Sequence, residues 1–123
     1  MVRVDIASRY EYQFDKDKIR RVVEKTLVEH GISSDVEVSL AVVGGRKMRE
    51  LHEKYMETDE VTDVLSFPLE GTVGPDGMLQ LGDIVVCYPE AVRQAAENNR
   101  LVDEEMAFLA EHACLHLLGI HHE

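Results

Sequence analysis

Residues 79–90 read LQLGDIVVCYPE, and this stretch decides the fold. Residues 81–87 are apolar almost throughout, which is typical of a strand buried on both faces at the centre of a sheet. Pro89 follows directly, and proline favours the first turn of a helix, so a helix is predicted to run to about Asn99. A buried central strand that leads into a helix indicates a layered α/β-type domain.

Shorter periodic stretches precede this strand. Apolar and polar residues alternate in two of them, as in half-buried strands, and apolar residues recur every three to four positions in two others, as in amphipathic helices. Asp15 is placed to cap the first of these helices, and Gly31 to end it. The predicted elements are strands at residues 2–6 and 36–42 and helices at residues 16–30 and 46–55.

A compact motif, TDVLSFP, occupies residues 62–68. Residues 64–67 predict a third strand, and Pro68 is expected to close it because proline lacks the N–H that a strand donates. Residues 71–77 hold three glycines and Pro75, so they predict a loop. By itself the motif is typical of a turn that leads into a strand.

The last predicted helix is apolar almost throughout residues 106–118. Asp103 is expected to cap it, with Glu104 and Glu105 favourably placed in its first turn. Gly119 suits its end, because glycine readily takes the left-handed conformation that stops a helix.

The length of 123 residues fits one domain, 1–123, and a hydrophobic content of 45% is enough for a buried core. No apolar run approaches the roughly 20 residues of a membrane span, and residues 1–10 lack the apolar centre of a secretory signal. We therefore expect a cytoplasmic protein without a membrane partner. Cys87 and Cys114 lie in apolar segments, so both are predicted to be small buried side chains.

The net charge of −11 is unevenly distributed. Residues 1–60 hold 11 Lys and Arg against 13 Asp and Glu, whereas residues 61–123 hold 2 against 11. An acidic chain has no general attraction for nucleic acid, so an RNA partner needs a local basic surface. The predicted helix at residues 46–55 offers one, although its row of cations is equally typical of a solvated helix face. The row consists of Arg46, Lys47, Arg49 and Lys54.

Four of the six histidines fall within residues 112–122, in the order His112-x-x-x-His116-x-x-Gly119-x-x-His122. Residues four apart on a helix lie one turn above each other, so two imidazoles can reach one ion. Gly119 lets the chain reverse and return a third imidazole to it. Three histidines leave the fourth tetrahedral position to water, as in catalytic zinc sites. The spacing predicts a single divalent metal, zinc, on His112, His116 and His122.

Alternatives remain at this site. His121 adjoins His122 and is a second candidate for the third ligand, and nickel, copper or cobalt also accept imidazole. Core or surface histidines without metal are the simplest alternative. The spacing equals that of metzincin proteases, in which a glutamate after the first histidine is the general base. Ala113 occupies that position and Glu111 lies on the wrong side of His112, which disfavours peptide hydrolysis.

Taken together, TDVLSFP, the LGDI of residues 81–84 and the histidines resemble the YbeY family of bacterial endoribonucleases. The resemblance covers nearly the whole chain. It implies an α+β fold, a single layered domain with a mixed sheet of about four strands, about four to five helices and a metal site at the C-terminal helix. It also implies that His122 rather than His121 joins His112 and His116 as a ligand. Residues that it places near the metal are Thr62, Asp63, Ser66 and Asp83.

The activity that the resemblance implies is zinc-dependent cleavage of single-stranded RNA, in maturation of the 16S rRNA 3′ end and in ribosome quality control. RNA and the ribosomal small subunit or its proteins are then the expected partners. Asp63 and Asp83 are expected to orient water or accept a proton, and Ser66 to belong to the catalytic site. Each of the two aspartates would equally suit a strand-end cap or a turn.

One departure from the family pattern bears on activity. Met56 stands where the family has an arginine, and phosphodiester cleavage develops negative charge that a cation stabilises. Either nearby cations compensate in part, or the activity is low or altered. Two other functions therefore stay open: a metal-dependent hydrolase of a peptide or small ester, and a ribosome-associated binding module whose metal is structural.

Overall fold

The computed structural model describes residues 1–9, 11–32, 35–56 and 63–120. Its sheet has the strand order β1-β2-β4-β3, in which β1, β2 and β4 are parallel and β3 is antiparallel to β4. The predicted α+β fold with a mixed four-stranded sheet is confirmed. The elements are β1 (Val2–Ser8), α1 (Lys16–Glu29), β2 (Val36–Val43), α2 (Gly45–Met56), β3 (Val64–Val73), β4 (Leu79–Cys87), α3 (Tyr88–Glu97) and α4 (Val102–Leu117).

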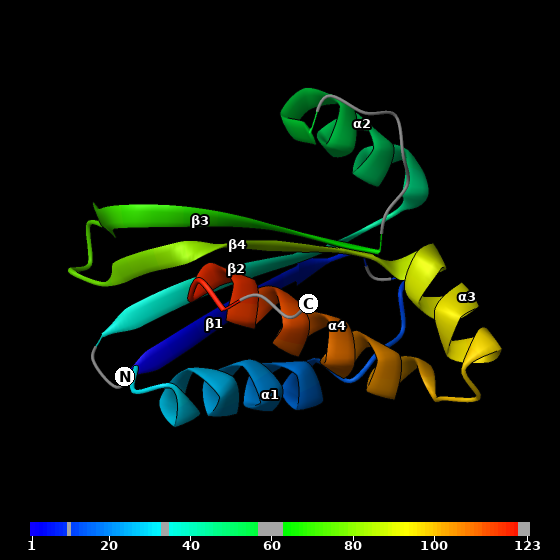
Figure 1. Ribbon diagram of the computed structural model, residues 1–123, viewed down its shortest axis with the longest axis horizontal. Helices are drawn as coiled ribbons and strands as arrows, with labels where there is room; N and C mark the ends of the chain where they lie inside the picture. Colours follow the sequence, from blue (N-terminus) through cyan, green and yellow to red (C-terminus); the bar gives the residue numbers. More distant parts are fainter. Residues whose placement is uncertain (10, 33–34, 57–62, 121–123) are drawn as a thin grey trace.

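The helices divide unevenly between the two faces of the sheet (Figure 1). α1 and α4 lie side by side across one face, α2 stands on the other side, and α3 lies beyond the end of β4. The main core fills the space between the sheet and α1 and α4, whereas a second, smaller core lies beneath α2. None of the described helices is both long and apolar enough to cross a membrane.

β4 is the central strand that its sequence predicts. Ile84 and Val86 point into the main core, while Val85 and Cys87 point into the core under α2. Because successive side chains of a strand face opposite sides, only a continuous apolar run can serve both cores.

Pro68 does not close β3, and residues 71–73 are not loop, so both predictions are wrong. β3 continues through Pro68 to Val73, and Pro68 pairs with Gly82 of β4. β3 is an edge strand, where a missing N–H leaves no neighbour unsatisfied, so proline is tolerated there. The ladder is irregular just after it, between Pro68 and Thr72.

Asp15 caps α1 as predicted, since its side chain accepts a hydrogen bond of 3.0 Å from the Lys18 N–H. The prediction for Asp103 is wrong, because the N-cap is Leu101 and α4 begins at Val102, two residues earlier than a cap at Asp103 requires. Asp103 instead accepts a hydrogen bond of 2.9 Å from the backbone N–H of Asp15, and so links the starts of α1 and α4.

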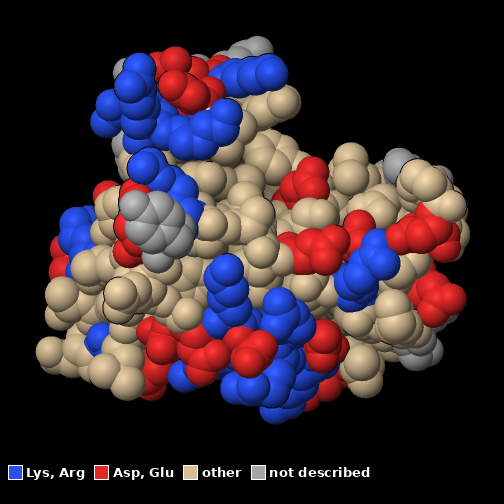
Figure 2. Space-filling view, turned by 180° about the vertical axis from the view of Figure 1, so that it is seen from behind, with Lys and Arg blue, Asp and Glu red and all other residues tan. Residues whose placement is uncertain are grey.

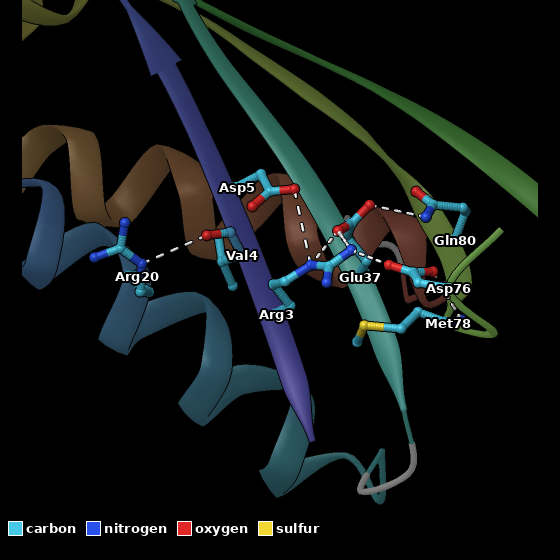
Figure 3. Close-up of polar contacts among 8 residues, drawn as sticks. All are labelled: Arg3, Val4, Asp5, Arg20, Glu37, Asp76, Met78 and Gln80. Carbon is cyan, nitrogen blue, oxygen red and sulfur yellow. Dashed lines mark hydrogen bonds and ion pairs between the residues drawn. The ribbon is translucent and has the colours of Figure 1, made fainter. Parts of the chain in front are cut away.

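A polar network joins the strands at the other end of the sheet (Figure 3). Arg3 of β1 lies between the carboxylates of Glu37 and Asp76 and contacts both, and Gln80 donates a 2.8 Å hydrogen bond to Glu37. The side chain of Glu37 is only 8% exposed. The hydrogen bonds from Gln80 and Arg3 lower the pKa of Glu37, so the buried carboxylate stays charged and paired.

Candidate active site

Two of the three predicted metal ligands are described, and they lie side by side on α4. The imidazole centroids of His112 and His116 are 4.5 Å apart, with 56° between the ring planes. Both rings are half-buried at the border of the helix face that carries Ala113 and Cys114 into the core. One-turn spacing therefore brings these two imidazoles together, as the sequence predicts.

The two histidines face a cavity of about 250 Å³ between α4 and the start of β3. Two other predicted site residues, Asp63 and Ser66, line the same cavity. The remaining lining residues are Val64, Phe108, Leu109 and Ala113. The cavity thus brings Asp63 and Ser66 together with His112 and His116, although at least 46 positions of the sequence separate the first pair from the second.

Strand pairing explains how Asp63 and Ser66 reach this space. Asp63 directly precedes β3, and its carbonyl accepts a 2.8 Å hydrogen bond from the Cys87 N–H at the end of β4. Ser66 pairs with Ile84, which points into the core between the sheet and α4. Paired residues face the same side of a sheet, so Ser66 also faces α4.

The expectation that Asp83 lies beside the histidines is not met. Asp83 precedes Ile84 in β4 and therefore points to the opposite face of the sheet. There it lines a different and larger cavity, together with Phe67 of β3. The sheet separates Asp83 from His112 and His116, so this carboxylate does not share their site.

Phe108 is a site residue that the sequence analysis missed. It lies one turn before His112, and the two rings stack with centroids 6.3 Å apart and 20° between their planes. The guanidinium carbon of Arg100 lies 5.1 Å from the Phe108 centroid. Phe108 is 51% exposed, so it forms an open aromatic wall of the cavity. The available signal was a large aromatic four residues before the first ligand on the same helix.

The third ligand position lies outside the described residues, as do His121, His122 and Thr62. Within residues 1–120, as far as they are described, no three His, Cys, Asp or Glu side chains form a metal-sized cluster. The two adjacent imidazoles nevertheless fit zinc, which prefers nitrogen ligands of this kind. α4 ends in a turn in which Gly119 has φ +79° and the Ile120 N–H donates a 2.9 Å hydrogen bond to the Leu115 carbonyl. The predicted left-handed conformation of Gly119 is confirmed.

The two cysteines are buried, as predicted, and neither lines this cavity. Burial raises the pKa of the Cys114 thiol to about 12, and burial also raises the pKa of Cys87. A thiol binds metal as the thiolate, so both side chains serve packing instead.

Comparison with known proteins places the chain in a family. The family profile described as "Endoribonuclease YbeY" matches residues 5–123. Among curated relatives, Endoribonuclease YbeY of Moorella thermoacetica is 42% identical over 113 residues, which cover 85% of this chain and 72% of the relative. Endoribonuclease YbeY of Finegoldia magna is 36% identical over 124 residues, covering 97% and 80%.

A solved structure agrees with these sequence matches. The chain is similar to the solution structure of TM1509 from Thermotoga maritima, with a TM-score of 0.59 and 28% sequence identity. The match covers 100% of this chain and 75% of that one. The profile match, the curated relatives and the shared fold agree, and the chain belongs to the endoribonuclease YbeY family.

Proposed function

We propose that this chain is a zinc-dependent endoribonuclease that cleaves single-stranded RNA. The observation that carries the proposal is the shared cavity in which Asp63 and Ser66 face the adjacent imidazoles of His112 and His116. Curated relatives that match over most of the chain are named endoribonucleases. Our proposal keeps His122 as the third ligand, on the spacing of the sequence motif.

The chain's own residues have distinct roles in the proposed reaction. Zinc, when bound, acts as a Lewis acid toward the phosphate and its attacking oxygen. Asp63 accepts a proton from the water whose oxygen bonds to phosphorus, while the P–O bond to the ribose oxygen breaks and that oxygen takes up a proton from solvent. Ser66 donates a hydrogen bond to a phosphate oxygen, and Phe108 offers a face on which a base can stack. Asp83 has no part in this step, because it lies across the sheet.

The RNA backbone away from the cleaved bond also needs cations, and α2 carries four of them. Figure 2 shows Lys and Arg side chains gathered over α2, where Arg46, Lys47, Arg49 and Lys54 occur within one helix. A small cavity at the start of α2 has Arg9, Arg46 and Lys47 in its lining. We propose that this basic surface of α2 binds the RNA backbone and partly replaces the arginine that the family has at position 56.

The family suggests where such an activity acts. We propose that the substrate is ribosomal RNA near the 3′ end of 16S rRNA, in the cytoplasm, with the ribosomal small subunit or its proteins as partner. Ribosomal RNA offers single-stranded segments where its bases are unpaired. Sequence-specific RNA-binding sites mostly recognise such unstacked bases.

The function is tested by cleavage of one end-labelled RNA, offered as a single strand and annealed to its complement. We expect the zinc-loaded protein to cut the single strand and to spare the duplex. Chelation should abolish the cutting, and zinc should restore it. Hydrolysis of a peptide or ester with no cutting of RNA would contradict the proposal and favour another hydrolase.

The basic surface of α2 is tested by charge reversal at Arg46, Lys47 and Arg49. Replacing all three by glutamate is expected to weaken single-stranded RNA binding at least about tenfold, and to lower the slope of log K against log salt by roughly 2. Fluorescence anisotropy at several salt concentrations measures both quantities. The matched control reverses Lys16, Arg21 and Lys25, which are exposed on α1 across the sheet. Equal losses in both triple variants would mean that only net charge matters.

A further inference from the structure

A second cavity is about twice as large as the one beside the histidines. It has a volume of about 550 Å³ and lies under α2, on the face of the sheet that α1 and α4 leave open. Its floor is hollow because β1 and β2 place Ala7, Ser39 and Ala41 there, and short side chains leave the space between the walls unfilled. The volume falls in the range of small-ligand pockets. We call this space the α2 cleft.

A row of oxygen atoms crosses the floor of the α2 cleft. Asp5 pairs with Ser39, and Ser39 pairs with Asp83, so the three side chains stand on neighbouring strands about 5 Å apart. Asp5 has an ion-pair neighbour in Arg3, at 3.9 Å. The Asp83 carboxylate has no hydrogen-bond or ion-pair partner among the described residues. A carboxylate only accepts hydrogen bonds, so Asp83 favours a ligand that donates them.

The wall of the α2 cleft is aromatic. Tyr55 and Phe67 meet edge to face, with centroids 5.1 Å apart and 63° between the rings. Phe67 pairs with Asp83 across β3 and β4, so the aromatic wall stands directly beside the carboxylate. Tyr55 is 53% exposed, which leaves part of its ring available to a ligand. A flat, hydrogen-bond-donating ring fits this combination of wall and floor.

One cation, Lys54, lies beside the aromatic wall of the α2 cleft, in contrast to its acidic floor. The ammonium of Lys54 lies 5.2 Å from the centroid of Tyr55. A cationic side chain of a protein partner would satisfy the floor but would be repelled by Lys54. A nucleotide satisfies both, because its base donates hydrogen bonds and its phosphate is anionic.

We propose that the α2 cleft binds one nucleobase of the RNA strand and prefers guanine; the proposal rests on the proposed function in taking RNA as the ligand. Guanine presents two adjacent donors, N1–H and N2–H₂, which can pair with both oxygens of Asp83. Adenine and cytosine each present one amino group, and uracil presents one N–H between two carbonyl acceptors that the carboxylate repels. The base stacks against Tyr55 and Phe67, and its phosphate lies near Lys54.

The recognised base is not the one at the cleaved bond. Ser66 faces the histidines and Phe67 faces the α2 cleft, so the two spaces lie on opposite sides of β3. β3 is the edge of the sheet, and a single strand can pass around it. The α2 cleft thus selects sequence at a fixed distance from the cut.

Binding is tested without metal and without cleavage. Isothermal titration of the zinc-free protein with GMP, AMP, CMP and UMP is expected to give the tightest binding for GMP, about tenfold tighter than for UMP. Asp83→Asn keeps the size of the side chain but removes one acceptor, and should weaken GMP binding about tenfold. Ala41→Leu fills the floor and should abolish it. Asp17→Asn, on the opposite side of the sheet, should change nothing. Melting curves confirm that each variant is folded.

The outcomes separate this proposal from the proposed function. Two results would overturn the base site alone, provided that the protein cleaves RNA. One is equal binding of all four nucleotides, and the other is GMP binding that Asp83→Asn does not weaken. Selective GMP binding by a protein that cuts no RNA would uphold the base site and refute the nuclease. A tri-arginine peptide that binds in an Asp83-dependent way, while GMP does not, would show that the α2 cleft is a protein-docking site and would overturn the proposal.

Discussion

Alanine at position 116 is expected to remove both zinc binding and RNA cleavage. His116 is the middle ligand in the spacing, and its ring lies 4.5 Å from that of His112. Changes in residues that only orient a ligand already cost 10- to 100-fold in metal affinity, so we expect loss of the ligand itself to cost more than about 100-fold. Zinc content after dialysis and the rate of cutting of a labelled single strand measure the two effects. The His116 ring is only half-buried, so its removal should change the fold little.

A second histidine provides the matched control. His30→Ala removes an exposed imidazole at the end of α1, where Nδ1 lies 2.8 Å from the Thr26 carbonyl, and should keep zinc and activity. Equal cutting by wild type and His116→Ala would indicate a contaminating nuclease. Full zinc content in His116→Ala would refute the ligand set. If wild type holds zinc but cuts nothing, the binding module becomes the better account, and Met56→Arg is then expected to restore no activity.

Alanine at position 82 is expected to cost roughly 2–4 kcal/mol of folding free energy, near the upper end for a single substitution. Gly82 has φ +157°, and a Cβ there would lie 2.6 Å from the Phe67 carbonyl oxygen and 2.6 Å from Leu117 Cδ2. The first of these atoms belongs to the backbone of β3, which cannot retreat without breaking its pairing with β4. Urea unfolding followed by circular dichroism measures the loss.

Another glycine serves as the control for this substitution. Gly45 begins α2, and a Cβ there would meet nothing within 4 Å. Gly45→Ala should therefore leave the stability unchanged or raise it by up to about 1 kcal/mol, because alanine favours helix. If Gly82→Ala unfolds at the same urea concentration as wild type, the close approach of β3 to Gly82 is wrong.

Local signals in the sequence predict most of the elements but not their exact ends. The apolar run of residues 81–87 identifies the central strand, and Asp15 identifies the start of α1. Pro68 and Asp103 mislead for the same reason. Each is governed by a contact with a distant segment, Pro68 by the edge position of β3 and Asp103 by the backbone of Asp15. Such contacts override local preference and cannot be read from neighbouring residues.

The candidate site shows the same division. Helical spacing alone predicts that His112 and His116 lie together. The motif that contains Asp83 gives no information about which face of the sheet its side chain takes. That depends on which face α4 covers, and Ile84 rather than Asp83 points toward α4. The α2 cleft is equally hidden, since its floor forms only when β1, β2 and β4 are placed side by side.

The strand order also governs the route by which the protein folds. Among the described strands, only β3 and β4 form a hairpin, which can close within microseconds. The pairs β1–β2 and β2–β4 are parallel and join segments more than 30 residues apart, so they form more slowly. α4 can dock only after the sheet offers it a face, so His112 and His116 meet Asp63 late. A chain emerging from the ribosome therefore lacks this constellation until α4 has been synthesised.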